Sequence, residues 1–235
     1  RSVAVVTMTF PPKARPSVSV RFQVIDERVR PDQKVQSVVK RWTAAAFAAF
    51  AKSGFAPERV VATVTDALDG RESTVRNRPG LLTDLATASF DREAGGVDVA
   101  IMNGGSIRID DVIQPGPVTE YDVIRILPFG GKVTRATFDG ALLSSVLDIG
   151  IKNQGTGGYL HARGTAREGN QWMVQGKPLD AAARYRVVLT DFLMSGGETN
   201  LGFLTRTNPG VHDVQDLRDV RLALIDELRV RYPLK

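Results

Sequence analysis

The sequence predicts an α+β fold, a mixed α/β arrangement in which helices and strands interleave without a strict strand–helix repeat. Runs rich in β-branched residues, such as residues 59–65 and 97–102, favour strands. Other segments, such as residues 139–149, place apolar residues near the 3.6-residue period of a helix. We find no internal repeat and no low-complexity tract, which argues against a repeat architecture.

Length and composition indicate a globular protein. The chain has 235 residues, of which 43% are hydrophobic, and this is enough for one large domain or two small ones. No apolar run approaches the roughly 18 residues of a membrane-spanning helix, and the N-terminal residues lack the pattern of a secretion signal. The chain has no cysteine, which excludes disulfides and thiolate metal sites but leaves the compartment open.

The charge balance is mildly basic. Lys and Arg number 31 against 26 Asp and Glu, and the net charge is +5. This excess favours anionic ligands through long-range attraction. The basic residues are spread along the chain, so a solvated mixed surface is a better interpretation than a nucleic-acid interface.

The N-terminal residues predict a ribbon followed by a long helix. Residues 2–10 and 18–25 are β-branched segments separated by the stiff sequence PPKARP, which predicts two antiparallel strands. A helix is expected over residues 32–53, with Asp32 as its N-cap and Gly54 beyond its end. A long helix after an isolated ribbon is typical of a linker between domains.

The remaining elements are expected in an irregular order. The strand at 97–102 is almost wholly apolar and should be covered on both faces. Asp139 is the expected N-cap of the helix that follows it. Other strands are expected at 59–65, 132–138, 158–163, 171–175 and 184–190, and helices at 80–92, 119–125, 139–149 and 214–231.

Several kinds of chemistry find no support in the sequence. His161 and His212 are the two histidines, and neither has carboxylates at a recognisable metal-ligand spacing. There is no cysteine and no G-x-S-x-G sequence for nucleophilic catalysis. No phosphate-binding P-loop is present either. A metal centre built by this chain alone is therefore not expected.

A glycine-rich loop follows the apolar strand in the sequence MNGGSIR. Gly104 and Gly105 allow a close approach of the backbone to a ligand. Asn103 offers a donor and an acceptor, and Arg108 offers a planar fork for phosphate or carboxylate. The same residues also fit a plain turn followed by a surface charge, and the two interpretations remain equally open on these residues alone.

Two further loops join an aromatic residue to a glycine pair. Phe129 precedes two glycines in ILPFGGK, and Phe192 with Glu198 flanks the glycine pair of LTDFLMSGGETN. Both phenylalanines fit buried anchors beside turns. Together with the Asn103 loop, however, they suit a nucleotide, with the rings on the base, the carboxylate on the ribose and the guanidinium on the phosphate.

An arginine cluster precedes the helix expected at 80–92. Arg71, Arg76 and Arg78 lie within the sequence GRESTVRNRPG. Arginines near a helix start can hold an anion, although such a run also fits a solvated loop.

Taken in order, these loops resemble the C-terminal domain of the 5′-nucleotidase family over about residues 55–232. NGGSIR is similar to the family's Asn-Gly-Gly-x-Ile-Arg element, and LPFGG to its Pro-Phe-Gly loop. GTGGYLHARG and YRVVLTDFLMSGGE are similar to its Gly-Gly-x-Leu and Phe-Leu-x-x-Gly-Gly-Asp elements. The resemblance implies a mixed sheet with flanking helices.

The resemblance also implies roles for individual residues. Phe129 and Phe192 would hold the base between them, Arg108 and Arg76 would bind the phosphate, and Asn103 would assist at the base or ribose. Glu198 stands where the family commonly has an Asp that contacts the ribose hydroxyls. The implied substrate-binding residues are Arg76, Asn103, Gly105, Arg108, Phe129, Gly158, Phe192 and Glu198.

Full-length family members carry a metallophosphoesterase domain in front, with two divalent metals and the catalytic residues. The resemblance implies that residues 1–30 are the terminal strands of such a domain, residues 31–54 its linker helix, and residues 55–235 the nucleotide-binding domain. The expected function is nucleotide binding within a 5′-nucleotidase-like hydrolase, with no cofactor or catalytic residue in this chain and no activity of the chain alone. The alternative is a stand-alone nucleotide-binding or interaction module. The family favours a periplasmic, cell-surface or secreted location.

Overall fold

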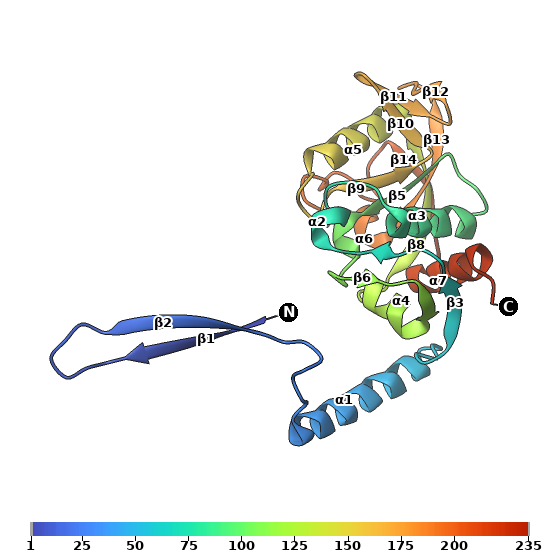
Figure 1. Ribbon diagram of the computed structural model, residues 1–235. Helices are drawn as coiled ribbons and strands as arrows, with labels where there is room; N and C mark the ends of the chain where they lie inside the picture. Colours follow the sequence, from blue (N-terminus) through green and yellow to red (C-terminus); the bar gives the residue numbers. More distant parts are fainter. Residues whose placement is uncertain (1, 235) are drawn as a thin grey trace. The chain divides into compact units, whose positions relative to one another are not determined.

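A computed structural model describes residues 2–234 and separates into two compact units (Figure 1). The first is Arg1–Ser53 and the second is Gly54–Lys235. The division falls at the C-terminal end of the long helix predicted over residues 32–53.

The first unit is a hairpin and a helix. Strands β1 (Ser2–Thr9) and β2 (Ser17–Val24) pair antiparallel over their whole length, and helix α1 (Gln33–Lys52) follows. The N-cap prediction is confirmed, because the Asp32 carboxylate accepts the Val35 N–H at 2.9 Å.

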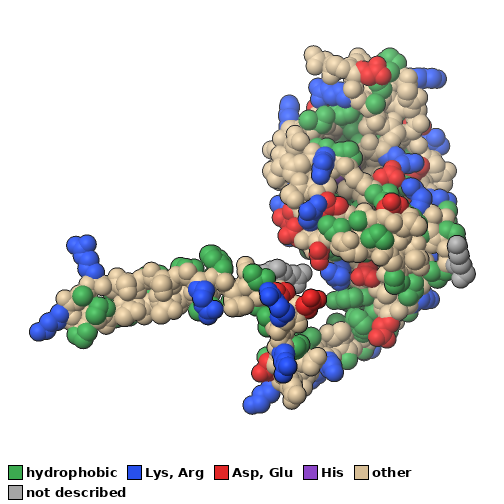
Figure 2. Space-filling view, in the orientation of Figure 1, with side chains coloured by type: hydrophobic (Ala, Val, Ile, Leu, Met, Phe, Trp, Pro, Cys, Tyr) green, Lys and Arg blue, Asp and Glu red, His purple; other side chains and the backbone are tan. Residues whose placement is uncertain are grey.

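Both faces of this hairpin are exposed. Every residue of β1 and β2 is exposed, including apolar side chains such as Val6 and Phe22, and Figure 2 shows hydrophobic side chains along its surface. An isolated two-stranded hairpin is marginally stable in water. The apolar side chains of these strands are therefore exposed to solvent instead of packing against another element.

The second unit is built on a mixed five-stranded sheet, and the predicted fold class is confirmed. The strand order is β14-β8-β13-β5-β9, in which β13 and β5 run parallel and all other neighbours run antiparallel. The strands are β14 (Val211–Asp219), β8 (Lys132–Asp139), β13 (Arg184–Thr190), β5 (Val99–Asn103) and β9 (Leu160–Arg163).

Helices cover both faces of this sheet. Helix α5 (Gly140–Lys152) packs on the face formed by residues such as Ile101 and Leu189, and helix α3 (Leu81–Glu93) contacts the other face of β5 and β13. Helix α7 (Val220–Arg231) packs beside α3. All residues of β5 are buried, which confirms the prediction that this strand is covered on both faces.

Short elements surround the sheet. The strand pairs are β3 (Val60–Val64) with β7 (Gly116–Thr119) and β4 (Leu68–Asp69) with β6 (Val112–Ile113). Three strands form a small separate sheet: β10 (Thr165–Glu168), β11 (Gln171–Val174) and β12 (Lys177–Pro178). The short helices are α2 (Glu72–Val75), α4 (Glu120–Ile126), α6 (Asp191–Met194) and the 3₁₀ turn Gly104–Ser106.

The prediction of a helix over residues 214–231 was wrong in its first part. Val214 and Leu217 lie in β14, which pairs with the edge of β8, and the helix begins only at Val220. Apolar residues continue at helical spacing from the strand into the helix, and for this reason the sequence predicted a single longer helix. The chain turns at Asp219, whose carboxylate accepts the Arg221 N–H at 2.8 Å and caps α7.

The predicted cap at Asp139 is correct in position only. Asp139 is the N-cap residue of α5, but its side chain makes no capping hydrogen bond. The carboxylate instead pairs with Arg184 and accepts a hydrogen bond from His212 Nε2 at 3.0 Å. Pairing across the sheet therefore outweighs local capping at this residue.

We expect Asp219→Ala to lower the free energy of unfolding by about 1 kcal/mol, because the first turn of α7 loses an acceptor. Urea denaturation measures the change. Asp219→Asn keeps an acceptor and should retain most of the stability. An equal loss in both variants would show that the cap contributes nothing there.

Candidate functional site

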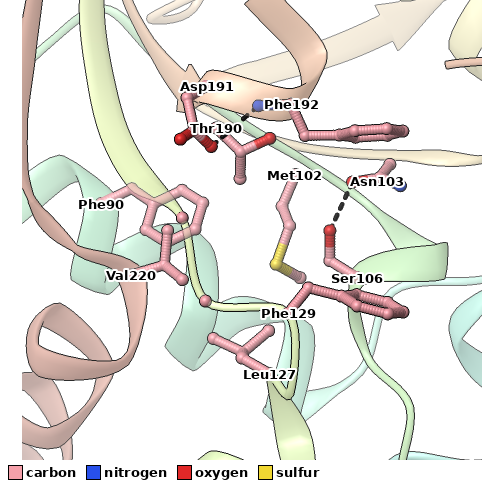
Figure 3. A pocket seen from close by; sticks show the side chains of 12 residues that line it. Phe90, Met102, Asn103, Ser106, Leu127, Phe129, Thr190, Asp191, Phe192 and Val220 are labelled. Atoms are coloured by element: carbon pink, nitrogen blue, oxygen red, sulfur yellow. Dashed lines mark hydrogen bonds between the residues drawn. The ribbon is translucent and has the colours of Figure 1, made fainter. Parts of the chain in front are cut away.

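A cavity of about 440 Å³ opens at the ends of the central strands (Figure 3). Its walls come from the ends of β5 and β13, the loop after α4, and residues of α3 and α7. Buried apolar side chains, among them Phe90, Met102 and Leu127, form its inner surface. Concave apolar cavities of this size are typical of small-molecule sites.

The two predicted stacking residues stand at this cavity. Phe129 is 75% exposed and Phe192 is 45% exposed, although both are large apolar side chains. Figure 3 shows the two rings nearly edge-on, one above the other, with Asn103 and Ser106 between their levels. The interpretation of these residues as buried anchors is therefore wrong, because neither ring packs into the core.

Glycines shape the loops that present the rings. Gly130 and Gly131 have φ values of +64° and +95°. Residues that carry a Cβ rarely adopt such positive φ values. A Cβ at Gly197 would lie 2.8 Å from Cε2 of Phe192, so this glycine makes room for the ring. The glycine pairs are thus required by the same loops that expose the phenylalanines.

Asn103 and Glu198 form one hydrogen-bonded unit. Asn103 is buried, and its Nδ2 donates to Glu198 Oε2 at 2.7 Å. Its Oδ1 accepts the hydroxyl of Ser106 at 2.6 Å. Glu198 Oε1 accepts the Thr199 N–H at 2.7 Å, and a Cβ at Gly158 would lie 3.0 Å from the same oxygen. Asn103 therefore orients the carboxylate across 95 residues of sequence.

The two predicted phosphate-binding arginines meet at one carboxylate. Arg76 forms an ion pair with Glu72, and Arg108 Nη1 lies 3.8 Å from the same Glu72 Oε1. The Arg108 guanidinium carbon also lies 5.7 Å from the centre of the Phe129 ring, within cation–π range. The arginines are thus gathered on the side of the site next to Phe129.

Arg71, the first arginine of the predicted cluster, is engaged elsewhere. Its guanidinium makes two hydrogen bonds to the Asp69 carboxylate, at 2.9 and 2.7 Å. This pairing holds the pKa of Asp69 well below its usual range. Arg71 is therefore paired with Asp69, whereas Arg76 and Arg108 share Glu72.

Close backbone contacts bring these loops together. A Cβ at Gly104 would lie 2.3 Å from the carbonyl oxygen of Val75, and one at Gly105 would lie 3.0 Å from Gly157. The Gly104 and Gly105 N–H groups donate to the carbonyls of Tyr159 and Gly157 at 2.7 and 2.8 Å. The close approach at Gly105 is therefore one between backbone segments of the protein, and contact of Gly105 with a ligand stays a prediction.

Sequence reasoning missed some of the residues of the site. The sequence does not distinguish apolar residues that line this cavity from ordinary core residues. Examples are Met102, Leu127 and Val220. Glu72 had a local signal, since it stands four residues before Arg76 at the spacing of a helical ion pair. Among residues 2–234, no group of three or more His, Asp or Glu side chains could hold a metal ion.

Comparison with known proteins identifies relatives of this chain. The profile of the family described as "5′-nucleotidase, C-terminal domain" matches residues 60–205. The chain is 31% identical to protein UshA of Yersinia enterocolitica over 144 residues, which cover 59% of this chain and 26% of that protein. It is 30% identical to a Vibrio cholerae 5′-nucleotidase over 138 residues, covering 56% and 24%. These matches span about a quarter of each relative.

Solved structures share the fold. A 5′-nucleotidase precursor from Thermus thermophilus superposes with a TM-score of 0.78 at 22% identity, covering all of this chain and 48% of that one. The NAD nucleotidase of Haemophilus influenzae superposes with a TM-score of 0.60 at 18% identity, covering 98% and 51%.

We expect Gly104→Ala to lower the free energy of unfolding by about 1–3 kcal/mol, because the new methyl group would overlap the Val75 carbonyl. Urea denaturation is again the measurement. Gly202→Ala is the matched control, since a Cβ there meets nothing within 4 Å, and it should change stability by less than about 0.5 kcal/mol. Equal effects of the two substitutions would contradict the packing argument.

Proposed function

The chain belongs to the 5′-nucleotidase C-terminal domain family, and on this premise we propose that it binds the nucleotide substrate of a metal-dependent phosphoester hydrolase. One observation carries the proposal. Two exposed phenylalanine rings, Phe129 and Phe192, stand on separate loops at the same apolar cavity.

The base lies between the two rings. Exposure of aromatic side chains to water is unfavourable. A flat base between Phe129 and Phe192 removes the facing surface of each ring from solvent. Stacking of this kind contributes about 1–3 kcal/mol per base. It tolerates different bases because every base has a π face, so the two rings favour nucleotides as a class.

The ribose lies beside the Asn103–Glu198 unit. The carboxylate is an acceptor for sugar hydroxyls, and its bonds to Asn103 and Thr199 hold it in one orientation before any ligand arrives. Gly105 and Gly158 let neighbouring groups pack closely around this unit, because a Cβ at Gly105 would meet the Gly157 backbone and one at Gly158 would meet Glu198 Oε1.

The phosphate replaces Glu72 between the arginines. Arg76 and Arg108 already share one anionic group, the Glu72 carboxylate, and both guanidinium groups can form paired hydrogen bonds to phosphate oxygens. Glu72 thus keeps the two side chains together until a phosphate displaces it. The place of Arg108 beside the Phe129 ring puts the phosphate near the base.

Hydrolysis itself requires a second domain. Residues 2–234 contain no cluster of metal ligands. The role proposed for this chain is to bind and orient the substrate. Two divalent metals and the catalytic residues belong to an N-terminal metallophosphoesterase domain. This chain alone is expected to bind nucleotide without hydrolysing it.

The N-terminal unit supports this division. The hairpin of β1 and β2 exposes apolar side chains on both faces, as expected of strands that complete a sheet of another domain. We assign residues 1–30 to that domain, residues 31–54 to the linker helix and residues 55–235 to nucleotide binding. The upstream coding sequence distinguishes this assignment from a stand-alone binding module, because only the former requires a preceding domain with His and Asp metal ligands.

A periplasmic, cell-surface or secreted location fits the family. One relative, 28% identical over 130 residues, is a 5′-nucleotidase of snake venom from Naja atra. No helix within residues 2–234 is long and apolar enough to cross a membrane.

Phe129→Ala and Phe192→Ala should each weaken adenosine binding by about 1–3 kcal/mol, because each removes one stacking surface. Isothermal titration calorimetry gives the affinities. Phe22→Ala is a matched control, since Phe22 is 72% exposed in the N-terminal unit, and its affinity should equal that of the wild type. Unchanged binding in both test variants would rule out the paired rings as the base site.

Arg108→Met should weaken binding of adenosine 5′-monophosphate about tenfold or more while changing adenosine binding by less than about twofold, because only the phosphate uses the guanidinium. Calorimetry at two salt concentrations should also show a smaller salt dependence in the variant. Arg71→Met, which breaks the pair with Asp69, serves as the control and should leave both affinities near those of the wild type. An equal loss of affinity for adenosine and for adenosine 5′-monophosphate would show that Arg108 does not bind the phosphate.

A further inference from the structure

Helix α2, which ends at the phosphate-side Arg76, depends on bonds from another part of the chain. It has four residues, and a helix this short is not stable by itself. Its last carbonyl groups have no partner within the helix. Pro79 stands four residues after Val75 and has no N–H, so a longer helix could not satisfy the Val75 carbonyl either.

Residues 154–161 supply the missing donors. Three successive carbonyls, those of Val75, Arg76 and Asn77, accept hydrogen bonds from this segment. The donors are His161 Nε2 at 2.7 Å, the Gly155 N–H at 2.8 Å and Gln154 Nε2 at 2.9 Å. His161 is the buried member of the three, with 5% of its surface exposed.

The state of His161 follows from its surroundings. A carbonyl oxygen only accepts hydrogen bonds, so Nε2 carries the proton in the bond to Val75. Nδ1 is buried and has no partner among the described residues, which disfavours a second proton. Burial also lowers the pKa of His161. The ring is therefore a neutral imidazole that donates through Nε2.

The Val75 carbonyl connects two parts of the site. It belongs to the peptide group between Val75 and Arg76. It also lies so close to Gly104, in the loop after Asn103, that a Cβ there would overlap it. If its hydrogen bond were lost, this buried carbonyl would be unsatisfied and the peptide could rotate. Any rotation would move Arg76 relative to Asn103.

We infer that His161 is a positioning residue for the phosphate-binding side of the site, acting through the Val75 carbonyl on Arg76. The inference rests on the proposed nucleotide-binding function. His161 makes no contact with the ligand in this arrangement, and its effect is confined to ligands that carry a phosphate.

Two substitutions separate the donor from the bulk of the ring. His161→Met fills similar space without a donor, whereas His161→Gln retains an N–H group. His212→Gln is the control, since His212 binds Asp139 at the far end of β8. Calorimetry of the full chain with adenosine and with adenosine 5′-monophosphate gives the affinities. His161→Met should weaken monophosphate binding about tenfold and adenosine binding less than about twofold, and His161→Gln should restore most of the loss.

A double-mutant cycle tests the route of the effect. Adding His161→Met to Arg76→Met should cause no further loss of monophosphate affinity, because the residue that His161 positions is already gone. Equal losses for both ligands, or additive losses in the cycle, would overturn the inference.

Amide hydrogen exchange tests the positioning role of His161 without relying on nucleotide binding. His161→Met should speed exchange at residues 72–78 relative to the wild type, without any ligand. Wild-type protein that binds neither ligand would overturn the proposed function and this role together. Unchanged exchange at residues 72–78 would overturn the positioning role even if nucleotide binding is found.

Discussion

The site depends on the close approach of three backbone segments at Gly104 and Gly105. There is room for no side chain between Gly104 and the Val75 carbonyl, and the Gly105 backbone touches that of Gly157. Hydrogen bonds from both N–H groups to residues 157 and 159 hold the segments in place. This contact joins the end of β5, which carries Asn103, the end of α2, which precedes Arg76, and the loop before β9.

Ion pairs and hydrogen bonds within the protein hold the polar groups of the proposed site without any ligand. Glu72 lies between Arg76 and Arg108, and Glu198 is fixed by Asn103. Ordering a flexible arginine at the moment of binding costs conformational entropy, which a pre-existing ion pair reduces. The proposed site therefore combines an apolar cavity with charged groups that already have partners within the protein.

The accuracy of sequence-based prediction varied with the range of the interactions involved. The apolar strand β5 and the N-cap at Asp32 were predictable because burial periodicity and capping are local properties. The junction at Asp219 was missed, since apolar spacing alone does not reveal that residues 211–219 pair with the edge of β8. The contacts of Glu72 with Arg108 and of His161 with the Val75 carbonyl were also missed, because each joins segments distant in the sequence.

The sequence by itself determined the α+β class, the order of most elements and the loops in which glycine pairs accompany Asn103, Phe129 and Phe192. These follow from periodicity and from the backbone freedom of glycine, which are written in consecutive residues. Only the tertiary structure decided that both rings are exposed at one cavity, that one carboxylate serves two arginines, and that a buried histidine supports the turn before Arg76. The reason is physical: exposure and hydrogen-bond partners depend on which distant segments the packed sheet brings together.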